Sequence, residues 1–104
     1  MSERYVYLWE FRTSALRRAE FERHYGAQGT WVQLFRRAPG YVGTELLHDG
    51  ADPLRFVTID RWMSASDYQS FRERFAREYA ELDARCEELT VSETLIGRFG
   101  EPAG

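Results

Sequence analysis

The sequence predicts an α+β protein of the ferredoxin-like type, β-α-(α)-β-β-α-β, with helices on one face of a four-stranded antiparallel sheet. Three observations predict this fold. Four short segments are rich in aromatic and β-branched residues, turn-forming residues join the middle two, and an apolar stripe of helical spacing precedes the last. The 104 residues have room for a single domain, 1–104, with a core at about 4–100 and a frayed tail at 100–104.

The chain opens with a predicted strand and a helix. Residues 5–11 are aromatic and β-branched without helical spacing, which is typical of a strand. Thr13 and Ser14 offer an N-cap to a helix over about 15–25, which Gly26 ends.

A second, shorter helix is expected to begin at Thr30. Trp31, Leu34 and Phe35 follow at helical spacing, and the turn signal at residues 38–40 stops the helix.

The second half of the chain contains a hairpin, a long helix and a last strand. Residues 41–48 and 54–62 are predicted to pair across a turn at 49–53. Ser64 then begins a helix of more than twenty residues, because apolar side chains recur at spacings of three and four, and Thr90–Phe99 forms the last strand. The stripe consists of Tyr68, Phe71, Phe75, Tyr79, Leu82, Cys86 and Leu89.

The composition excludes several classes of function. All 14 basic residues are arginine, and the chain has no lysine and no asparagine, so a Schiff-base lysine, a P-loop lysine and a catalytic asparagine are excluded. Cys86 is the single cysteine, and no Cys/His pair has zinc spacing, so we expect no disulfide and no metal. A net charge of −3 argues against a nucleic-acid partner. With no apolar run near the ~20 residues of a membrane helix and no signal-peptide pattern, we expect a cytoplasmic protein without a membrane partner.

The predicted strands carry apolar side chains on both faces. In the first strand, Trp9 and Phe11 point one way and Val6 and Leu8 the other, and the strand at 54–62 has the same property. The helices of one chain can cover only one of these faces. Burying ~600 Å² of apolar surface contributes roughly 15 kcal/mol at about 25 cal/mol per Å². We therefore expect a homodimer that packs through the open sheet face.

Four segments of the chain resemble the antibiotic biosynthesis monooxygenase (ABM) family, which belongs to the dimeric α/β-barrel superfamily. The most specific marks are Pro39-Gly40-Tyr41, which opens the second strand, and Trp62, which ends the third strand just before the long helix. The segments are Trp31–Tyr41, Thr58–Trp62, Tyr68–Phe71 and Leu95–Phe99, within a likeness that spans about residues 4–100.

The resemblance implies a dimeric α/β barrel that oxidises an aromatic phenol or anthrone with O₂ and no cofactor, in a cavity between sheet and helices. Such chemistry needs an apolar cavity for a flat aromatic ligand, a base, and a donor for charge on oxygen. Family members that degrade haem use an asparagine on the first strand and a histidine after the tryptophan. This chain has no asparagine and no histidine after His48, which argues against haem degradation. The quinone-forming members also use an asparagine near the pocket, so the base remains unassigned.

Two aromatic residues match the family's pocket residues. Trp62 matches the strand-end tryptophan, whose indole N–H can donate into a cavity; alternatively it anchors the core. Tyr68 matches a polar aromatic residue of the pocket, or is a half-buried tyrosine with its hydroxyl in water. Phe71 and Phe75 on the same helix face are candidates for the cavity wall or for the core.

Polar candidates follow from their positions. Arg72 lies one turn beyond Tyr68 and can neutralise a phenolate, or is a solvated surface charge. Thr58 shares a strand face with Trp62 and can hydrogen-bond a substrate. His24 ends the first predicted helix, as a base turned toward the cavity or as a charge favoured by the helix dipole.

The remaining candidates are less specific. Glu10 is an acid in an apolar strand, either at the pocket with a raised pKa or at the dimer interface paired with an arginine. Trp31 and Phe35 are expected to cap the cavity mouth or to join the core. His48 is expected to be exposed, and Cys86 to be an inert buried residue.

The sequence thus predicts a cofactor-independent monooxygenase with Trp62, Tyr68, Arg72 and His24 in catalytic roles. Thr58, Phe71, Phe75, Trp31, Phe35 and Glu10 are the predicted substrate-binding residues. One alternative is a non-catalytic dimer that binds a small hydrophobic metabolite. Another is a closed core without a cavity, which serves only for dimerisation.

Overall fold

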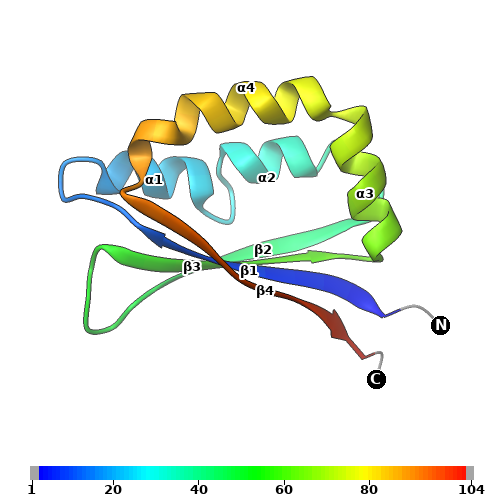
Figure 1. Cartoon of the computed structure of the whole chain (residues 1–104), viewed down its shortest axis with the longest axis horizontal. Coiled ribbons are helices and arrows are strands. Elements are labelled where there is room, and N and C mark those ends of the chain that lie inside the picture. The colour runs from blue at the N-terminus through cyan, green and yellow to red at the C-terminus, as the bar shows by residue number, and fades with distance from the viewer. Residues whose placement is uncertain (1–2, 103–104) are drawn as a thin grey trace.

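A computed structural model describes residues 3–102 and confirms the predicted fold class (Figure 1). One four-stranded antiparallel sheet carries all the helices on a single face. The elements are β1 (Arg4–Arg12), α1 (Arg18–Tyr25), α2 (Thr30–Phe35), β2 (Tyr41–His48), β3 (Arg55–Trp62), α3 (Ala65–Arg74), α4 (Ala76–Cys86), a 3-10 turn (Glu87–Leu89) and β4 (Ser92–Glu101).

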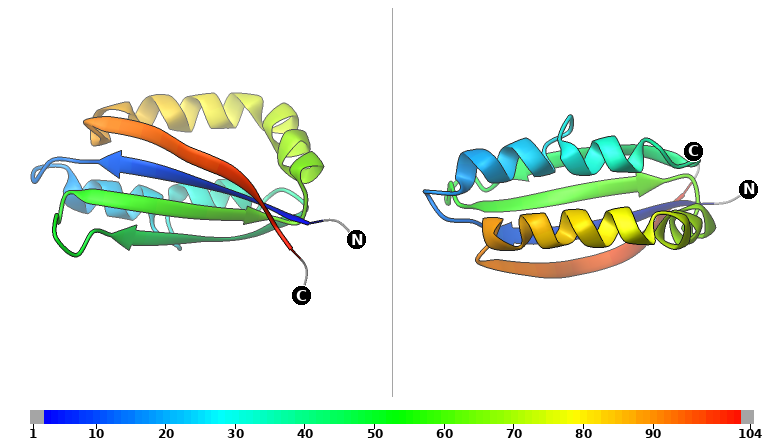
Figure 2. Two further views of the ribbon diagram at one scale, coloured as in Figure 1. Left: turned by 60° about the horizontal axis from the view of Figure 1, so that its bottom comes forward. Right: turned by 90° about the horizontal axis from the view of Figure 1, so that it is seen from above.

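The sheet has the strand order β2-β3-β1-β4, so the first and third strands form its centre. Seen from above, α1 and α2 follow one another along the β2–β3 side, and α4 runs beside them along the β1–β4 side (Figure 2). Alternate side chains of β1 and β3, among them Tyr7, Thr58 and Asp60, point into the space between these two helical rows and the centre of the sheet.

The prediction of one long helix after Ser64 is wrong, because the structure has two helices there, α3 and α4. Ser64 does cap it, because its Oγ accepts a hydrogen bond from the backbone N–H of Asp67 at 3.1 Å. The helix breaks at Phe75, whose φ of −110° and ψ of 27° are not helical. The break turns the chain so that α3 closes the ends of β1 and β3 while α4 runs across the sheet (Figure 1). No residue is inserted at Phe75, so the apolar spacing continues through the break and conceals it.

Two element boundaries also differ from the prediction. Residues 15–17 form a turn, and α1 begins only at Arg18, because the Ser14 hydroxyl caps that turn by accepting from the backbone N–H of Arg17. β4 continues to Glu101, which pairs with Arg4, so residues 100 and 101 of the predicted frayed tail belong to the sheet. Residues 103–104 of that tail lie outside the described residues.

Aromatic rings dominate the core between the sheet and the helices. Trp62 and Phe71 are fully buried, and their ring centroids lie 5.0 Å apart. The ring of Phe35 packs edge-on against both of them. Around them, Phe21 and Phe56 pack with their centroids 4.9 Å apart. Such pairs contribute about 0.5–1.5 kcal/mol each beyond the area they bury.

The backbone at Gly40 explains why a glycine stands just before β2. Its φ of +89° lies in the left-handed region that favours glycine. A Cβ on Gly40 would come within 2.5 Å of the Asp67 side chain at the start of α3. The Gly40 carbonyl also accepts from the backbone N–H of Met63 at 2.7 Å, which joins the start of β2 to the end of β3.

The face of the sheet opposite the helices, called here the outer face, combines apolar residues with ion pairs. Phe99 is 50% exposed and Leu47 is 49% exposed, although both belong to strands. Ion pairs flank them, since Arg55 contacts Glu10 on this face. The other apolar residues of the outer face are Val6, Leu8, Val57 and Ile59.

None of the helices within residues 3–102 combines the length and the apolar character that crossing a membrane requires.

Candidate functional site

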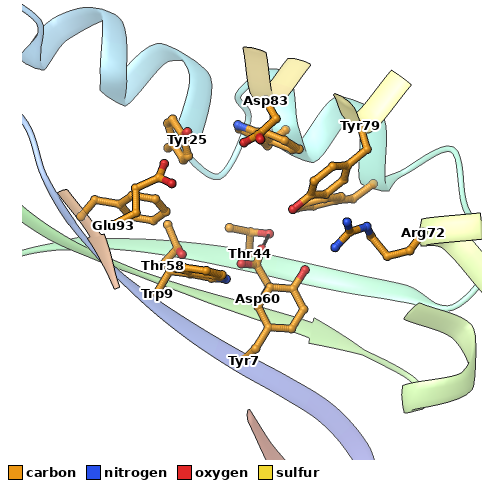
Figure 3. Close-up of a pocket in the computed structure, with 13 residues that line it drawn as sticks. Tyr7, Trp9, Tyr25, Thr44, Thr58, Asp60, Arg72, Tyr79, Asp83 and Glu93 are labelled. Atoms are coloured by element: carbon orange, nitrogen blue, oxygen red, sulfur yellow. Dashed lines mark hydrogen bonds between the residues drawn. The ribbon is translucent and has the colours of Figure 1, made fainter. Parts of the chain in front are cut away.

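A cavity of about 360 Å³ lies between the sheet and the helices (Figure 3). Its volume is in the range of small-molecule sites, so the closed-core alternative is wrong. The wall combines aromatic rings with hydroxyl and carboxyl groups. The sheet contributes Tyr7, Trp9, Phe11, Thr44, Thr58, Asp60 and Glu93, and the helices contribute Tyr25, Trp31, Phe35, Arg72, Tyr79 and Asp83.

One row of residues across the sheet forms the polar floor of this cavity. Thr44 on β2 lies opposite Asp60 on β3, which lies opposite Tyr7 on β1. Alternation along β3 turns Asp60 toward the helices, as it does Thr58 and Trp62. The sheet register therefore places a carboxyl group between two hydroxyl groups.

Of the carboxyl groups within residues 3–102, Asp60 has the most strongly shifted pKa. Only 5% of its surface is exposed, and burial raises its pKa to about 7, against the opposing effect of the hydrogen bond from Thr44. Thr44 Oγ1 donates to Asp60 Oδ1 at 2.5 Å. Within residues 3–102 the second carboxyl oxygen, Oδ2, has no hydrogen-bond partner, so it is free to meet a ligand in the cavity.

Tyr7 is a neutral donor beside Asp60 (Figure 3). Burial and the negative charge of Asp60 raise the pKa of the Tyr7 hydroxyl well above its ordinary value. The fully buried indole Nε1 of Trp62 donates to the Tyr7 hydroxyl oxygen at 3.3 Å. Because that oxygen already accepts, the Tyr7 proton is available to an acceptor inside the cavity.

Arg72 supplies a positive charge at one end of the cavity. Its guanidinium donates to the Tyr68 hydroxyl at 3.1 Å and lies 3.8 Å from the centre of the Tyr79 ring. These two contacts hold the long side chain in place. Burial raises the pKa of Tyr79 to about 12, so its hydroxyl is also a neutral donor at physiological pH.

The opposite side of the cavity is acidic. Asp83 on α4 and Glu93 on β4 lie near Tyr25, away from Arg72 (Figure 3). Burial and the charge of Asp83 raise the pKa of Glu93. The cavity is therefore electrically asymmetric, with the arginine and the two acids at different ends.

Four of the residues expected from the sequence line the cavity. They come from three separate elements, which the fold brings together around one space. These residues are Thr58, Arg72, Trp31 and Phe35.

Trp62 and Tyr68 lie behind this wall and reach the cavity through their neighbours. Trp62 contacts it through Tyr7, and Tyr68 through Arg72. Phe71 and Phe75 belong to the hydrophobic core and are not among the lining residues.

His24 and Glu10 lie away from the cavity. His24 Nδ1 bonds the Thr30 hydroxyl at 2.9 Å, and partial burial, with the charge of Arg23, lowers its pKa. Glu10 pairs with Arg55 on the outer face, so its pairing with an arginine is confirmed, while its place in a dimer interface stays a prediction. His48 is exposed and Cys86 is buried, as expected.

The sequence interpretation missed Asp60, Tyr7 and Thr44. Asp60 was detectable, because it lies midway between Thr58 and Trp62 on the same predicted strand face. Tyr7 was equally accessible as an inward residue of the first strand. Thr44 was not, because its place opposite Asp60 depends on a register shift between Tyr41 and Gly43.

No group of three or more histidine, cysteine, aspartate or glutamate side chains within residues 3–102 is arranged to hold a metal ion.

Comparison with known proteins identifies the family. The family model for antibiotic biosynthesis monooxygenases matches residues 5–78, which is more than half of the chain. The chain therefore belongs to the antibiotic biosynthesis monooxygenase (ABM) family, as the resemblance in its sequence predicted. No curated protein matches the sequence.

Solved structures of low sequence identity share the fold. A mutant of SnoaB, a cofactor-independent oxygenase from Streptomyces nogalater, has a TM-score of 0.81 and 17% identity, covering 99% of this chain and 97% of that one. A putative antibiotic biosynthesis monooxygenase from Nitrosomonas europaea has a TM-score of 0.75 and 17% identity, covering 100% and 97%. Another from Bordetella bronchiseptica has a TM-score of 0.73 and 17% identity, covering 97% and 99%.

Proposed function

We propose that this protein oxidises an aromatic phenol or anthrone with O₂, without a cofactor, and that Asp60 is the base. The observation that carries the proposal is a carboxyl group, 5% exposed, whose pKa is about 7 in an aromatic-walled cavity. A base is most effective when its pKa lies near the working pH. The family and the fold shared with a cofactor-independent oxygenase support the same class of reaction.

The proposed reaction balances without an external reductant. Asp60 Oδ2 takes a proton from the activated C–H of the anthrone, which leaves an electron-rich anion. The anion gives electrons to O₂ and forms a peroxide at that carbon. Loss of water then leaves a quinone carbonyl, so the substrate supplies all four electrons, one oxygen atom stays in the product and the other leaves in water.

Two further groups would stabilise negative charge on oxygen. The Tyr7 hydroxyl belongs to a cavity-lining residue and can donate to an enolate or peroxide oxygen, while Trp62 donates to its oxygen from behind. The Arg72 guanidinium, held by Tyr68, offsets charge at the other end of the ligand. In this proposal Trp62 and Tyr68 are positioning residues and Arg72 touches the substrate.

A thermal-shift screen of anthrones and hydroquinones, followed by oxygen uptake for each compound that binds, tests the proposal. We expect at least one compound that stabilises the protein and consumes O₂ with quinone formation. Stabilisation without oxygen uptake by any compound that binds would support the alternative of a non-catalytic binding protein.

Tyr7→Phe is expected to lower the rate of quinone formation by about a hundredfold to a thousandfold, because removing a donor to a developing oxyanion costs on this order. The ring and its packing remain, so the melting temperature should change little. Trp9→Phe, also in the cavity wall but without a hydrogen bond to the reacting region, is the matched control. Equal losses in both variants would show that cavity shape, and not the hydroxyl, sets the rate.

We also propose that two copies pack through the outer face. Its apolar residues include the half-exposed Phe99 and Leu47, while the chain's own helices cover only the opposite face. Ile59→Asp is expected to shift sedimentation from a dimer to a monomer, because burying a charge at the centre of that surface has a large free-energy cost. Val42→Asp, at an exposed position where β2 shifts register, is the control. A wild-type protein that sediments only at 12.2 kDa at micromolar concentration would contradict the dimer.

A further inference from the structure

A chain of two hydroxyl groups leads from Asp60 to the edge of the sheet. Thr44 Oγ1 donates to Asp60 Oδ1 at 2.5 Å, and the Tyr41 hydroxyl lies 2.6 Å from the same Thr44 oxygen. A threonine hydroxyl has a single proton, and Asp60 receives it. While Asp60 is ionised, Tyr41 must therefore be the donor to Thr44, so the donors run from Tyr41 through Thr44 to Asp60.

The outer end of this chain is a partly exposed residue. Tyr41 is partly exposed, stands at the start of the edge strand β2, and is not among the residues that line the cavity. The inner end is a carboxyl group that a bound aromatic molecule would cover on its cavity side. Within residues 3–102, Thr44 is the hydrogen-bond partner of Asp60, so these two hydroxyls form the hydrogen-bonded route that leads from Asp60 to the partly exposed Tyr41.

We propose that Tyr41 and Thr44 form a proton relay that connects Asp60 with bulk water while substrate occupies the cavity. The proposal rests on the proposed role of Asp60 as the base. Its use is to prevent internal return, in which Asp60 gives the proton straight back to the substrate anion before O₂ reacts.

The proton balance of the relay is simple. Before outward transfer, the Asp60 carboxyl turns its protonated oxygen toward Thr44, and the Thr44 and Tyr41 hydroxyls rotate so that their protons point outward. Asp60 then gives its proton to Thr44 Oγ1, the Thr44 proton passes to the Tyr41 oxygen, and the Tyr41 proton passes to water. Each oxygen receives one proton and releases one, and no electrons move. The transfer leaves Thr44 donating to Asp60 and Tyr41 donating to Thr44, which are the original hydrogen bonds.

The groups that face Asp60 keep their own charge constant near neutral pH. Tyr7, Tyr41 and Tyr79 all have a raised pKa, so they stay protonated and neutral near pH 7. Arg72 remains charged on the far side of the cavity. Asp60 is thus the group in its surroundings that changes charge near neutral pH.

Anaerobic hydrogen–deuterium exchange of anthrone in D₂O tests the relay without the oxidation step. Asp60 removes the activated C–H proton, and deuterium reaches the substrate only if Asp60 exchanges with solvent before returning it. We expect Tyr41→Phe and Thr44→Val to slow enzyme-catalysed exchange by about tenfold, which lies below the 10²–10⁴ that general acid–base catalysis contributes. Thr44→Ser, which keeps the hydroxyl, should restore exchange, and Tyr5→Phe, which removes a tyrosine hydroxyl on β1 outside the relay, should match the wild type.

The pH profile of exchange separates loss of the relay from a change in the pKa of Asp60. The Thr44 hydrogen bond lowers the pKa of Asp60, so Thr44→Val should also move the midpoint of the profile upward. Tyr41→Phe keeps the bond between Thr44 and Asp60, so it should lower the plateau rate at high pH and leave the midpoint in place. A shifted midpoint with an unchanged plateau in both variants would overturn the relay.

Asp60→Asn distinguishes failure of the relay from failure of the proposed function. If Asp60→Asn abolishes exchange while Tyr41→Phe and Thr44→Val equal the wild type, Asp60 is the base and the relay is wrong. If Asp60→Asn exchanges anthrone like the wild type, or the wild type does not exchange it above background, the base assignment falls and the relay falls with it.

Discussion

Asp60→Asn is expected to lower the rate of anthrone oxidation by about 10²–10⁴-fold, the contribution of a general base to catalysis. The asparagine keeps the shape of the side chain and can still accept the hydrogen bond from Thr44. The binding of substrate should therefore change much less than turnover. Asp83→Asn, which neutralises another cavity carboxyl that is exposed, is the matched control and should retain activity within a few-fold.

The same role predicts a pH dependence with a definite sign. Asp60 accepts a proton only when it is ionised, and its pKa is about 7. The rate should therefore rise with pH through about 7 and level off above 8. A rate that is flat between pH 5 and 8 would show that the base has an ordinary carboxyl pKa or is another group.

Asp60→Asn is also expected to stabilise the fold at pH 8. Burial raises the pKa of Asp60 from 3.8 to about 7, so the folded state holds its proton more tightly than the unfolded state does. Wild-type stability should then fall as pH rises from about 4 to 7 and level off above 7. At 1.36 kcal/mol per pH unit, ionising Asp60 lowers the free energy of unfolding by roughly 4 kcal/mol. The variant has no carboxyl group at this position and therefore keeps this stability.

Urea denaturation of wild type and variant at pH 4 and pH 8 measures this effect. The variant should gain several kcal/mol in the free energy of unfolding at pH 8 and little at pH 4. Asp52→Asn, which breaks an exposed ion pair with Arg12, is the control and should lose no more than about 1 kcal/mol. A variant less stable than the wild type at pH 8 would mean that the Asp60 carboxylate serves the fold.

The strands and their succession along the chain were predictable, because local sequence features determine where each strand forms. The strand residues 5–11 and the hairpin around 49–53 follow from β propensity and turn residues, and the structure confirms both. The break at Phe75 was not predictable, because the apolar spacing is the same in a straight helix and in a bent one. Tertiary packing of α3 against the end of the sheet decides between them.

The candidate site was predictable only in part. Thr58 and Arg72 reach the cavity as expected, because strand alternation and helical spacing fix where they point. The family's motif drew attention to Trp62, but the structure places it behind Tyr7. The pairing of Asp60 with Thr44 and Tyr7 depends on the sheet register, which a single sequence does not determine.

Carbon-13 NMR titration of the Asp60 carboxyl group, assigned by its absence in Asp60→Asn, tests the account most directly. The measurement needs no substrate and reports on the group that the proposed chemistry requires. We expect a midpoint near pH 7 in the free protein. A midpoint at or below about 5, close to that of an ordinary aspartate, would contradict the assignment of Asp60 as the base.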